Sequence, residues 1–187
     1  MEPVRKYLTV DEVERLLVRT SDPTDNILFQ VGLTWACRVS EILSVRLINI
    51  DGRVVKIWDE KKDEYRHVVT DKATEAALTT YLDTHYKPPR GVRKDFQTLF
   101  NMSAKTVNRR IKKWFEVADV SKDVPWRWHT LRHTYVRRML DNLKDTSIQF
   151  ICEQTGDSPE TILRYYGVPS IEERLRVAED YSITNQR

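Results

Sequence analysis

The fold is decided by residues 26–45, NILFQVGLTWACRVSEILSV. This stretch is almost wholly apolar, and its length favours one or two buried helices over a strand. Arg38 and Glu41 interrupt it. Burying a permanently charged arginine without a partner costs several kcal/mol, so Arg38 must meet a negative charge. Either Glu41, three residues on, supplies that charge through a local ion pair, or an external anion does.

Residues 48–71, INIDGRVVKIWDEKKDEYRHVVTD, follow directly and alternate in period two. Asp51 and Gly52 form a typical hairpin turn, and a second, charged turn falls at residues 61–64. The pattern predicts a three-stranded antiparallel meander.

The residue patterns in the rest of the chain predict helices. Thr9 and Glu12 form a capping box at the start of one, and Ser158 with Pro159 starts another. Further helices are expected over residues 72–85, 103–118, 129–143 and 146–154, and near the end of the chain over residues 172–181. We therefore expect one α+β domain over residues 1–187, mainly helical, with a small three-stranded antiparallel sheet.

Composition excludes several classes of protein. The net charge is only +3, but 31 Lys and Arg residues allow a strongly cationic face. The two cysteines are far apart and neither HExxH nor GxxxxGK[ST] occurs, so a disulfide framework, a zinc site and a nucleotide-binding loop are not supported. No long apolar run or signal peptide argues for a membrane or for export, so we expect a cytoplasmic protein with reduced thiols.

Residues 128–138, WHTLRHTYVRR, concentrate two histidines and three arginines. His129 and Arg132 are three apart and project from one side of a helix. The stretch is a solvated face, a metal site or an anion site. A metal would need more ligands than the chain offers, whereas guanidinium groups bind phosphate oxygens in pairs.

Residues 103–118, SAKTVNRRIKKWFEVA, form a basic amphipathic helix with five cations before its first acid. Such a face is either solvated or lies against a DNA duplex. We expect DNA contacts from Lys105, Arg109, Arg110 and Lys113.

Four motifs in chain order resemble those of the tyrosine site-specific recombinases and phage-type integrases. They are ACRVSE (36–41), KKDEYRHVV (61–69), HTLRHT (129–134) and SPETILRYY (158–166). Residues 7–17, YLTVDEVERLL, resemble the usual opening of the family's catalytic domain, so the likeness covers essentially the whole chain. The resemblance implies the helical DNA breaking-rejoining fold with its small sheet.

The same resemblance implies site roles for five residues. Arg38 and Arg132 match the two catalytic arginines, and Glu41 the acid that supports the first of them. His129 matches the histidine of the HxxR motif. Lys61 matches the hairpin lysine, because the pattern K-x-x-x-x-R-x-V ends at positions 66 and 68.

Tyr165 and Tyr166 compete as nucleophile, because adjacent helical residues point about 100° apart. Counting from Gly156 favours Tyr166, whereas counting from the helix start favours Tyr165, and we expect Tyr165. Asp157 stands where the family usually has His or Trp. It either points away and caps the helix, or is replaced by another donor such as His133 or Lys62, or signals weakened chemistry.

The resemblance implies site-specific recombination or integration of duplex DNA, as for a mobile element or virus. Cleavage would run through a covalent 3′-phosphotyrosyl intermediate without metal, ATP or cofactor. The alternatives are a catalytically impaired DNA-binding module and a type IB topoisomerase-like enzyme. We expect the family's N-terminal DNA-clamping domain to be absent from this chain, which is then either a fragment or a minimal enzyme. We therefore expect a monomer without DNA, and self-association on DNA, as in a tetrameric synapse, through the helix at 172–181.

Overall fold

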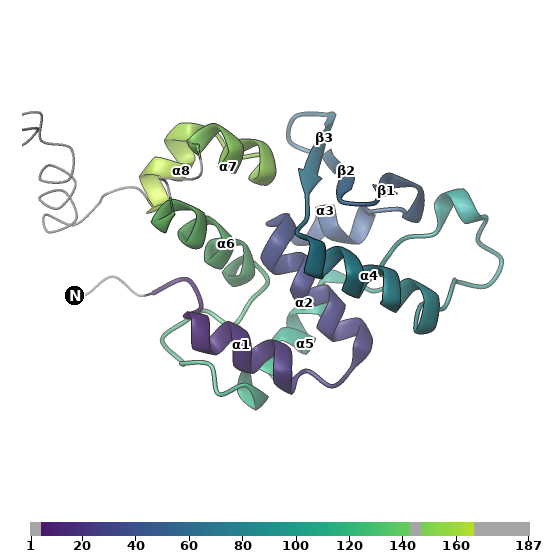
Figure 1. Cartoon of the computed structure of the whole chain (residues 1–187), viewed down its shortest axis with the longest axis horizontal. Helices are drawn as coiled ribbons and strands as arrows, with labels where there is room; N and C mark the ends of the chain where they lie inside the picture. The colour runs from purple at the N-terminus through teal and green to yellow at the C-terminus, as the bar shows by residue number, and fades with distance from the viewer. Residues whose placement is uncertain (1–4, 143–146, 167–187) are drawn as a thin grey trace, which may run out of the picture.

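The computed structural model describes residues 5–142 and 147–166. Figure 1 shows their arrangement. The helices of this part are α1 (Val10–Arg19), α2 (Pro23–Trp35), α3 (Val39–Ser44), α4 (Lys72–Thr84), α5 (Ala104–Val117), α6 (His129–Asp141), α7 (Ile148–Thr155) and α8 (Pro159–Tyr166). The strands are β1 (Ile50–Asp51), β2 (Val54–Asp59) and β3 (Glu64–Val69), and two short 3₁₀ turns are η1 (Leu47–Asn49) and η2 (Lys94–Phe96). The expected mainly helical α+β fold is confirmed.

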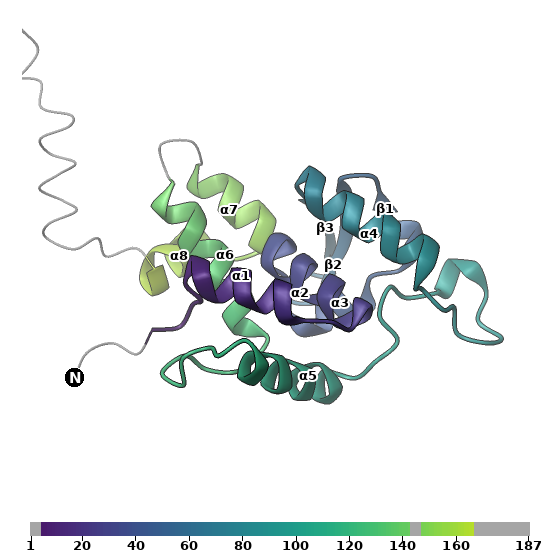
Figure 2. The same ribbon diagram turned by 60° about the horizontal axis from the view of Figure 1, so that its bottom comes forward.

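Helix α2 lies at the centre, with α6 packed on one side and α4 on another (Figures 1 and 2). Leu28, Phe29 and Trp35 of this helix are completely buried. Gly32 allows α6 to approach closely, because a Cβ there would lie 2.8 Å from side-chain carbons of both Leu131 and Trp128. Residues 26–35 of the apolar stretch therefore belong to the core helix of the molecule.

The buried stretch forms two helices rather than one because the chain bends between Trp35 and Val39. Ala36 ends α2 in the left-handed region with φ of 51°. A residue with a Cβ is unfavourable there, so packing and hydrogen bonds must hold it in place. The bend leaves the carbonyl of Ala36 free of the helix, and that oxygen accepts a hydrogen bond from Arg132.

The sheet is the expected meander, with strand order β1-β2-β3. Residue Val55 pairs with Val68, and Ile57 pairs with Arg66. Val55, Ile57 and Val68 are completely buried, so this face of the sheet packs on the core. The register places Arg66 on the same inward face, where a charged side chain needs partners.

Helices α6, α7 and α8 pack around a second small core, formed with Ala36 by Tyr135, Val136, Ile151 and Ile162. Gln154 joins this part to the sheet. Its side-chain amide exchanges hydrogen bonds with the backbone N–H and C=O of Val69, at 3.0 and 2.7 Å. The end of α7 is thereby held beside β3.

The helix starts follow the expected capping. Thr9 and Glu12 form the capping box of α1, and Ser158 caps α8 through a 3.3 Å hydrogen bond from the backbone N–H of Thr161. None of the helices in the described ranges is both long and apolar enough to cross a membrane. The helix expected at residues 172–181 lies outside the described residues.

Candidate active site

Arg38 stands just before α3, and its local ion pair with Glu41 is present. The Glu41 carboxylate accepts the backbone N–H of Arg38 at 2.7 Å and its Nη1 at 2.9 Å. Glu41 is buried, whereas the Arg38 side chain keeps 31% of its surface exposed. The carboxylate therefore orients an arginine that still reaches solvent.

Arg132 approaches the same place from α6 and is almost fully buried, at 2% exposed. Its Nη1 donates to the carbonyl oxygens of Ala36, at 2.7 Å, and of Thr155, at 2.8 Å. Both carbonyls lie at helix ends, where they lack a helical partner. The ends of α2 and α7 thus hold the guanidinium in one orientation.

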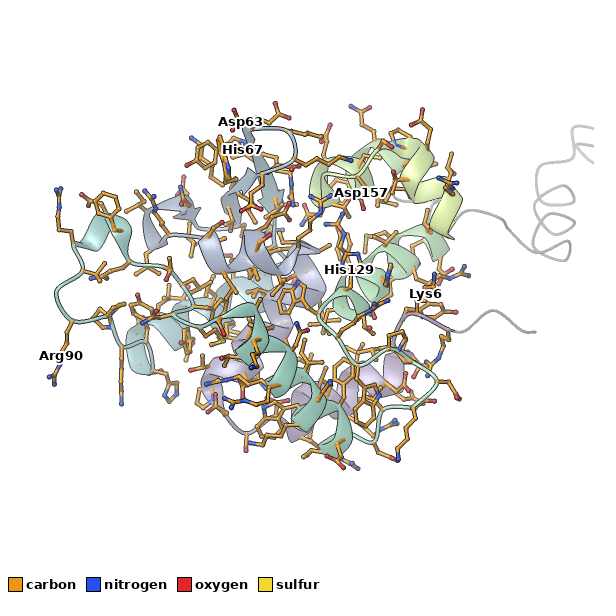
Figure 3. All side chains as sticks on the ribbon, turned by 180° about the vertical axis from the view of Figure 1, so that it is seen from behind. Lys6, Asp63, His67, Arg90, His129 and Asp157 are labelled. Carbon is orange, nitrogen blue, oxygen red and sulfur yellow. The ribbon has the colours of Figure 1, made fainter. Side chains whose placement is uncertain are left out.

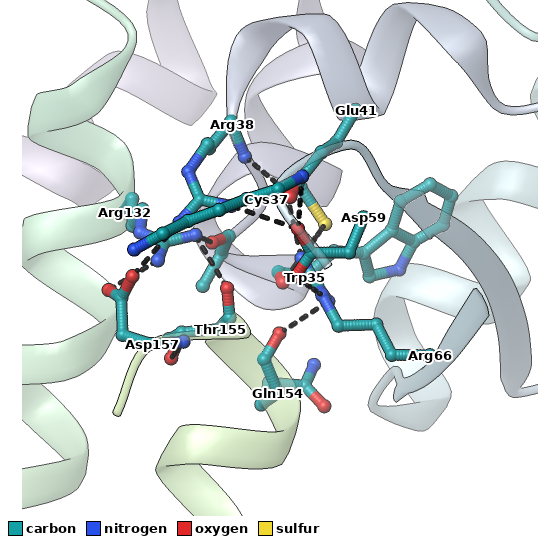
Figure 4. Close-up of polar contacts among 12 residues, drawn as sticks. Trp35, Cys37, Arg38, Glu41, Asp59, Arg66, Arg132, Gln154, Thr155 and Asp157 are labelled. Atoms are coloured by element: carbon teal, nitrogen blue, oxygen red, sulfur yellow. Dashed lines mark hydrogen bonds and ion pairs between the residues drawn. The ribbon is translucent and has the colours of Figure 1, made fainter. Parts of the chain in front are cut away.

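Asp157 bridges the two arginines, as Figure 4 shows. One carboxylate oxygen accepts from Nη2 of Arg38 at 3.1 Å, and the other forms a short ion pair with Nη2 of Arg132. The interpretation that Asp157 points away from the site is wrong. The loop that carries it follows Gly156, whose φ of 76° favours glycine.

Arg66 and Asp59 support this cluster from the sheet. Arg66 donates from Nη2 to Glu41 at 2.8 Å and from Nη1 to the carbonyl of Gln154 at 2.9 Å. The sequence patterns assigned Arg66 no role of its own in the site. The feature that could have indicated one is its charge on a strand, two residues before the buried Val68 and therefore on the same face of the sheet.

Lys61 lies on the β2–β3 turn and lines a cavity of about 270 Å³ with Arg38, Ser40, Glu41 and Glu60. The buried Asp59 carboxylate accepts the backbone N–H of Lys61 at 3.0 Å and so shapes the turn. The turn lysine and the first arginine therefore face one open space beside the cluster.

His129 begins α6, one turn before Arg132. Figure 3 shows it on the same side of the molecule as Asp157. Partial burial and then the charge of Arg132 lower the pKa of His129, while the nearby Asp157 carboxylate acts in the opposite direction. Its ring also meets that of His133 edge to face, with centroids 4.9 Å apart. Because its pKa is lowered, the His129 imidazole is neutral at neutral pH.

Tyr165 and Tyr166 both belong to α8, which starts at Pro159 as expected. Tyr165 is the seventh residue of that helix. The side chains of both tyrosines lie outside the described part, so the choice between them stays a prediction.

The basic helix α5 presents Lys105, Arg109 and Lys113 to solvent. Arg110 differs, because its guanidinium is 2.5 Å from the buried Asp25 carboxylate on α2. The helix is tied to the start of α6 by a hydrogen bond from the backbone N–H of Trp128 to the side-chain oxygen of Asn108, at 3.3 Å. The expected DNA-contacting face thus adjoins the HxxR segment.

Within the described residues, neither a reactive Cys37 thiol nor a metal centre is supported. Burial raises the pKa of the Cys37 thiol to about 12, so it stays protonated. Within residues 5–142 and 147–166, no three His, Cys, Asp or Glu side chains are arranged to hold a metal ion.

Residues 6–167 match the model of the phage integrase family. Among similar solved structures, XerA recombinase is 23% identical over 97% of this chain and 66% of its own, with a TM-score of 0.76. XerH recombinase, solved with its difH substrate in a pre-cleavage complex, is 19% identical over 98% and 55%, with a TM-score of 0.73. The catalytic domain of bacteriophage HP1 integrase is 18% identical over 97% and 98%, with a TM-score of 0.64.

The chain thus spans 66% of the XerA chain and 55% of the XerH chain. Because these sequence identities are all 23% or lower, the structural likeness shows the fold alone. No curated protein sequence matches the chain. The family model, however, covers most of the 187 residues. This chain therefore belongs to the phage integrase family of tyrosine recombinases.

Proposed function

We propose that this chain is the catalytic domain of a site-specific recombinase that cuts and rejoins duplex DNA through a phosphotyrosyl intermediate. One observation carries the proposal: Arg38 and Arg132, far apart in sequence, direct guanidinium nitrogens at the two oxygens of one carboxylate. An anion held between two fixed arginines is what transfer at a phosphodiester requires, because charge on its non-bridging oxygens must be stabilised in the transition state.

In the proposed step the hydroxyl oxygen of Tyr165 attacks the phosphorus in line. A new oxygen–phosphorus bond forms to the tyrosine, the bond to the 5′-oxygen breaks, and a 5′-hydroxyl is released. A second DNA strand reverses the step with its own 5′-hydroxyl. Because one phosphoester replaces another, the bond energy is conserved.

Protons are assigned to two groups. Lys61 donates one to the leaving 5′-oxygen, which its position beside the cavity next to Arg38 supports. His129 accepts the phenolic proton of Tyr165 or orients the phosphate. The lowered pKa of His129 supports the accepting role, since only a neutral imidazole takes up a proton.

The duplex is proposed to lie across α5, with Lys105, Arg109 and Lys113 meeting the phosphate backbone. Arg110 joins them only through the part of its side chain that its pair with Asp25 leaves exposed. We assign self-association on DNA to residues 172–181 and expect a monomer without DNA. Light scattering without DNA measures the oligomeric state, and a stable oligomer would contradict the expected monomer.

A nicked suicide duplex tests the proposal. The native chain should accumulate a covalent protein–DNA adduct, and Tyr165→Phe should abolish it while Tyr166→Phe retains it. Loss of the adduct only in Tyr166→Phe would move the nucleophile by one residue. Complete absence of the adduct, with DNA still shifted in a gel, would overturn the enzymatic proposal.

A DNA-binding module without catalysis is the second candidate, because Asp157 fills the space between the arginines. It predicts DNA binding with no adduct in any variant. A topoisomerase-like enzyme would form the adduct and relax supercoiled DNA without exchanging strands between two sites. Strand-exchange assays on paired sites separate it from a recombinase.

A further inference from the structure

The ion-paired cluster of the candidate site is balanced in formal charge. Within the part of the chain that the structure describes, it joins three guanidinium groups, Arg38, Arg66 and Arg132, to three carboxylates, Glu41, Asp59 and Asp157. A phosphodiester adds one negative charge. If it joined the cluster as it stands, an excess negative charge would be placed among largely buried groups, which is costly.

The three carboxylates are not equally replaceable. Glu41 accepts both the backbone N–H of Arg38 and the guanidinium of Arg66, and it is only 1% exposed. Asp59 is completely buried and accepts the backbone N–H of Lys61. Both therefore hold the backbone as well as the arginines, and removing either would leave buried donors without acceptors.

Asp157 is held differently. Its carboxylate contacts the two arginines, and its side chain is 17% exposed. It lies on the short loop between α7 and α8, directly after Gly156 in the left-handed region. Its own backbone N–H donates to the Thr155 hydroxyl at 3.2 Å, so the main chain has a support that does not involve the carboxylate.

The arginines also have supports that do not depend on Asp157. Each directs Nη1 to the protein framework: Arg38 to Glu41, and Arg132 to the carbonyls of Ala36 and Thr155. Each directs Nη2 to Asp157. Removing the carboxylate would free one donor nitrogen on each arginine without releasing either guanidinium from its position.

From this arrangement we infer that Asp157 occupies the place of the scissile phosphate in the DNA-free protein, so that DNA must displace its carboxylate before cleavage. The inference rests on the proposed function. One oxygen goes to each arginine, as two non-bridging oxygens of a phosphodiester would, and the exchange of one negative charge for another keeps the cluster balanced. Asp157 thereby acts against DNA binding at this site, as an internal competitor.

Thermal unfolding with added inorganic phosphate tests the anion site without any catalysis. In Asp157→Asn the arginine pair loses its negatively charged partner, so phosphate should raise the unfolding temperature more than it does for the native chain. Glu160→Gln is the matched control, since it also removes one negative charge, from an exposed side chain three residues on whose carboxylate meets the Ser158 hydroxyl. An equal phosphate response in the two variants would overturn the inference.

The rate of adduct formation on the suicide duplex provides the second readout. At subsaturating DNA, Asp157→Asn should form the adduct on the order of tenfold faster than the native chain, because a site occupied about nine-tenths of the time loses about tenfold in apparent affinity. Its unfolding temperature without phosphate should fall, because two arginines then face each other. A merely structural role for Asp157 predicts that stability and cleavage fall together.

Asp157→Ser, smaller and neutral, repeats both measurements in case the asparagine variant does not fold. An unchanged or slower adduct rate in the folded variants, with a normal adduct from the native chain, would overturn the inference and leave the proposed function standing. The converse separates the two as well. A larger phosphate response in Asp157→Asn with no adduct from any variant would support the anion site and reject the enzyme.

Discussion

Arg110 with Asp25 and Arg132 with Asp157 form two ion pairs that differ in what else holds the aspartate. Asp25 lies in the first turn of α2, is 4% exposed, and also accepts the indole N–H of Trp114 at 2.7 Å. Asp157 lies on a loop, and within residues 5–142 and 147–166 the partners of its carboxylate are the guanidinium groups of Arg38 and Arg132.

In the first pair the aspartate is fixed and the arginine side chain is 32% exposed, whereas in the second the arginine is fixed and the aspartate can leave. Residue types therefore do not separate a structural ion pair from an anion site. The additional hydrogen bonds of the acid separate them, together with the freedom of the backbone that carries it.

The largest contrast is expected between Arg132→Lys and Arg110→Lys. A lysine at 132 cannot donate at once to two carbonyls and an anion in the fixed planar geometry of a guanidinium. Adduct formation should fall on the order of 10²- to 10³-fold, the usual effect of losing one preorganised donor. Arg110→Lys, assayed at saturating DNA, should keep its adduct rate. A similar loss in both variants would erase the distinction between the two pairs.

Glu12 is another carboxylate of the fixed kind, like Asp25. Burial alone would raise its pKa, but hydrogen bonds from Arg5 and from the backbone N–H groups of Ser121 and Thr9 lower it to about 2. Because this folded-state pKa lies below the usual 4.5, the stabilisation is fully present above pH 4.5 and is lost as the pH falls toward 2.

Glu12→Gln should therefore lower the free energy of unfolding by about 3 kcal/mol at pH 7, by the linkage between pKa and stability. Urea titrations at several pH values should show this difference shrinking below about pH 4.5. Glu14→Gln, an exposed change on the same helix, is the control and should show almost no difference. A constant deficit for Glu12→Gln across the pH range would contradict the assignment.

Asp25→Asn should lower the free energy of unfolding by about 2 kcal/mol, since it removes a buried charge that serves both Arg110 and Trp114. Phosphate should not change its thermal stability more than that of the native chain, in contrast to Asp157→Asn. Asp83→Asn on the exposed side of α4 provides the comparison. A phosphate response in Asp25→Asn equal to that of Asp157→Asn would show that the first pair is also an anion site.

The smallest effect is expected on the exposed face of α5. Lys105→Ala should weaken DNA binding uniformly across sequences and make the slope of log affinity against log salt less steep by about 0.9, the value for one lost phosphate contact. Fluorescence anisotropy at several salt concentrations measures both. Lys87→Ala, an exposed lysine in the loop after α4, should leave the slope unchanged. Equal slopes for the native chain and Lys105→Ala would remove α5 from the proposed interface.

Local signals were sufficient for the helix starts and the sheet. The capping residues Thr9 and Ser158 act within one turn, and the alternation of β2 reflects one buried face, so these elements could be predicted from neighbouring residues. The roles at Arg38, Lys61, His129 and Arg132 were expected from ordered motifs. The structure brings Arg38 and Arg132 to one carboxylate and places Lys61 beside the cavity next to Arg38.

Three features depended on distant partners. Ala36 adopts a left-handed conformation that no local signal favours, and its carbonyl meets Arg132. Gln154 is an ordinary polar residue in sequence, yet its amide pairs with the backbone of Val69. For Asp157 the sequence left its direction open.

The sequence by itself determined the elements, their order and the set of charged groups available for the site, because caps, turns and hydrophobic periodicity act between near neighbours. Only the tertiary structure decided that Asp157 turns inward between Arg38 and Arg132. The physical reason is that a largely buried cluster must balance its charge, and the identity of the balancing group depends on which distant segments are packed together.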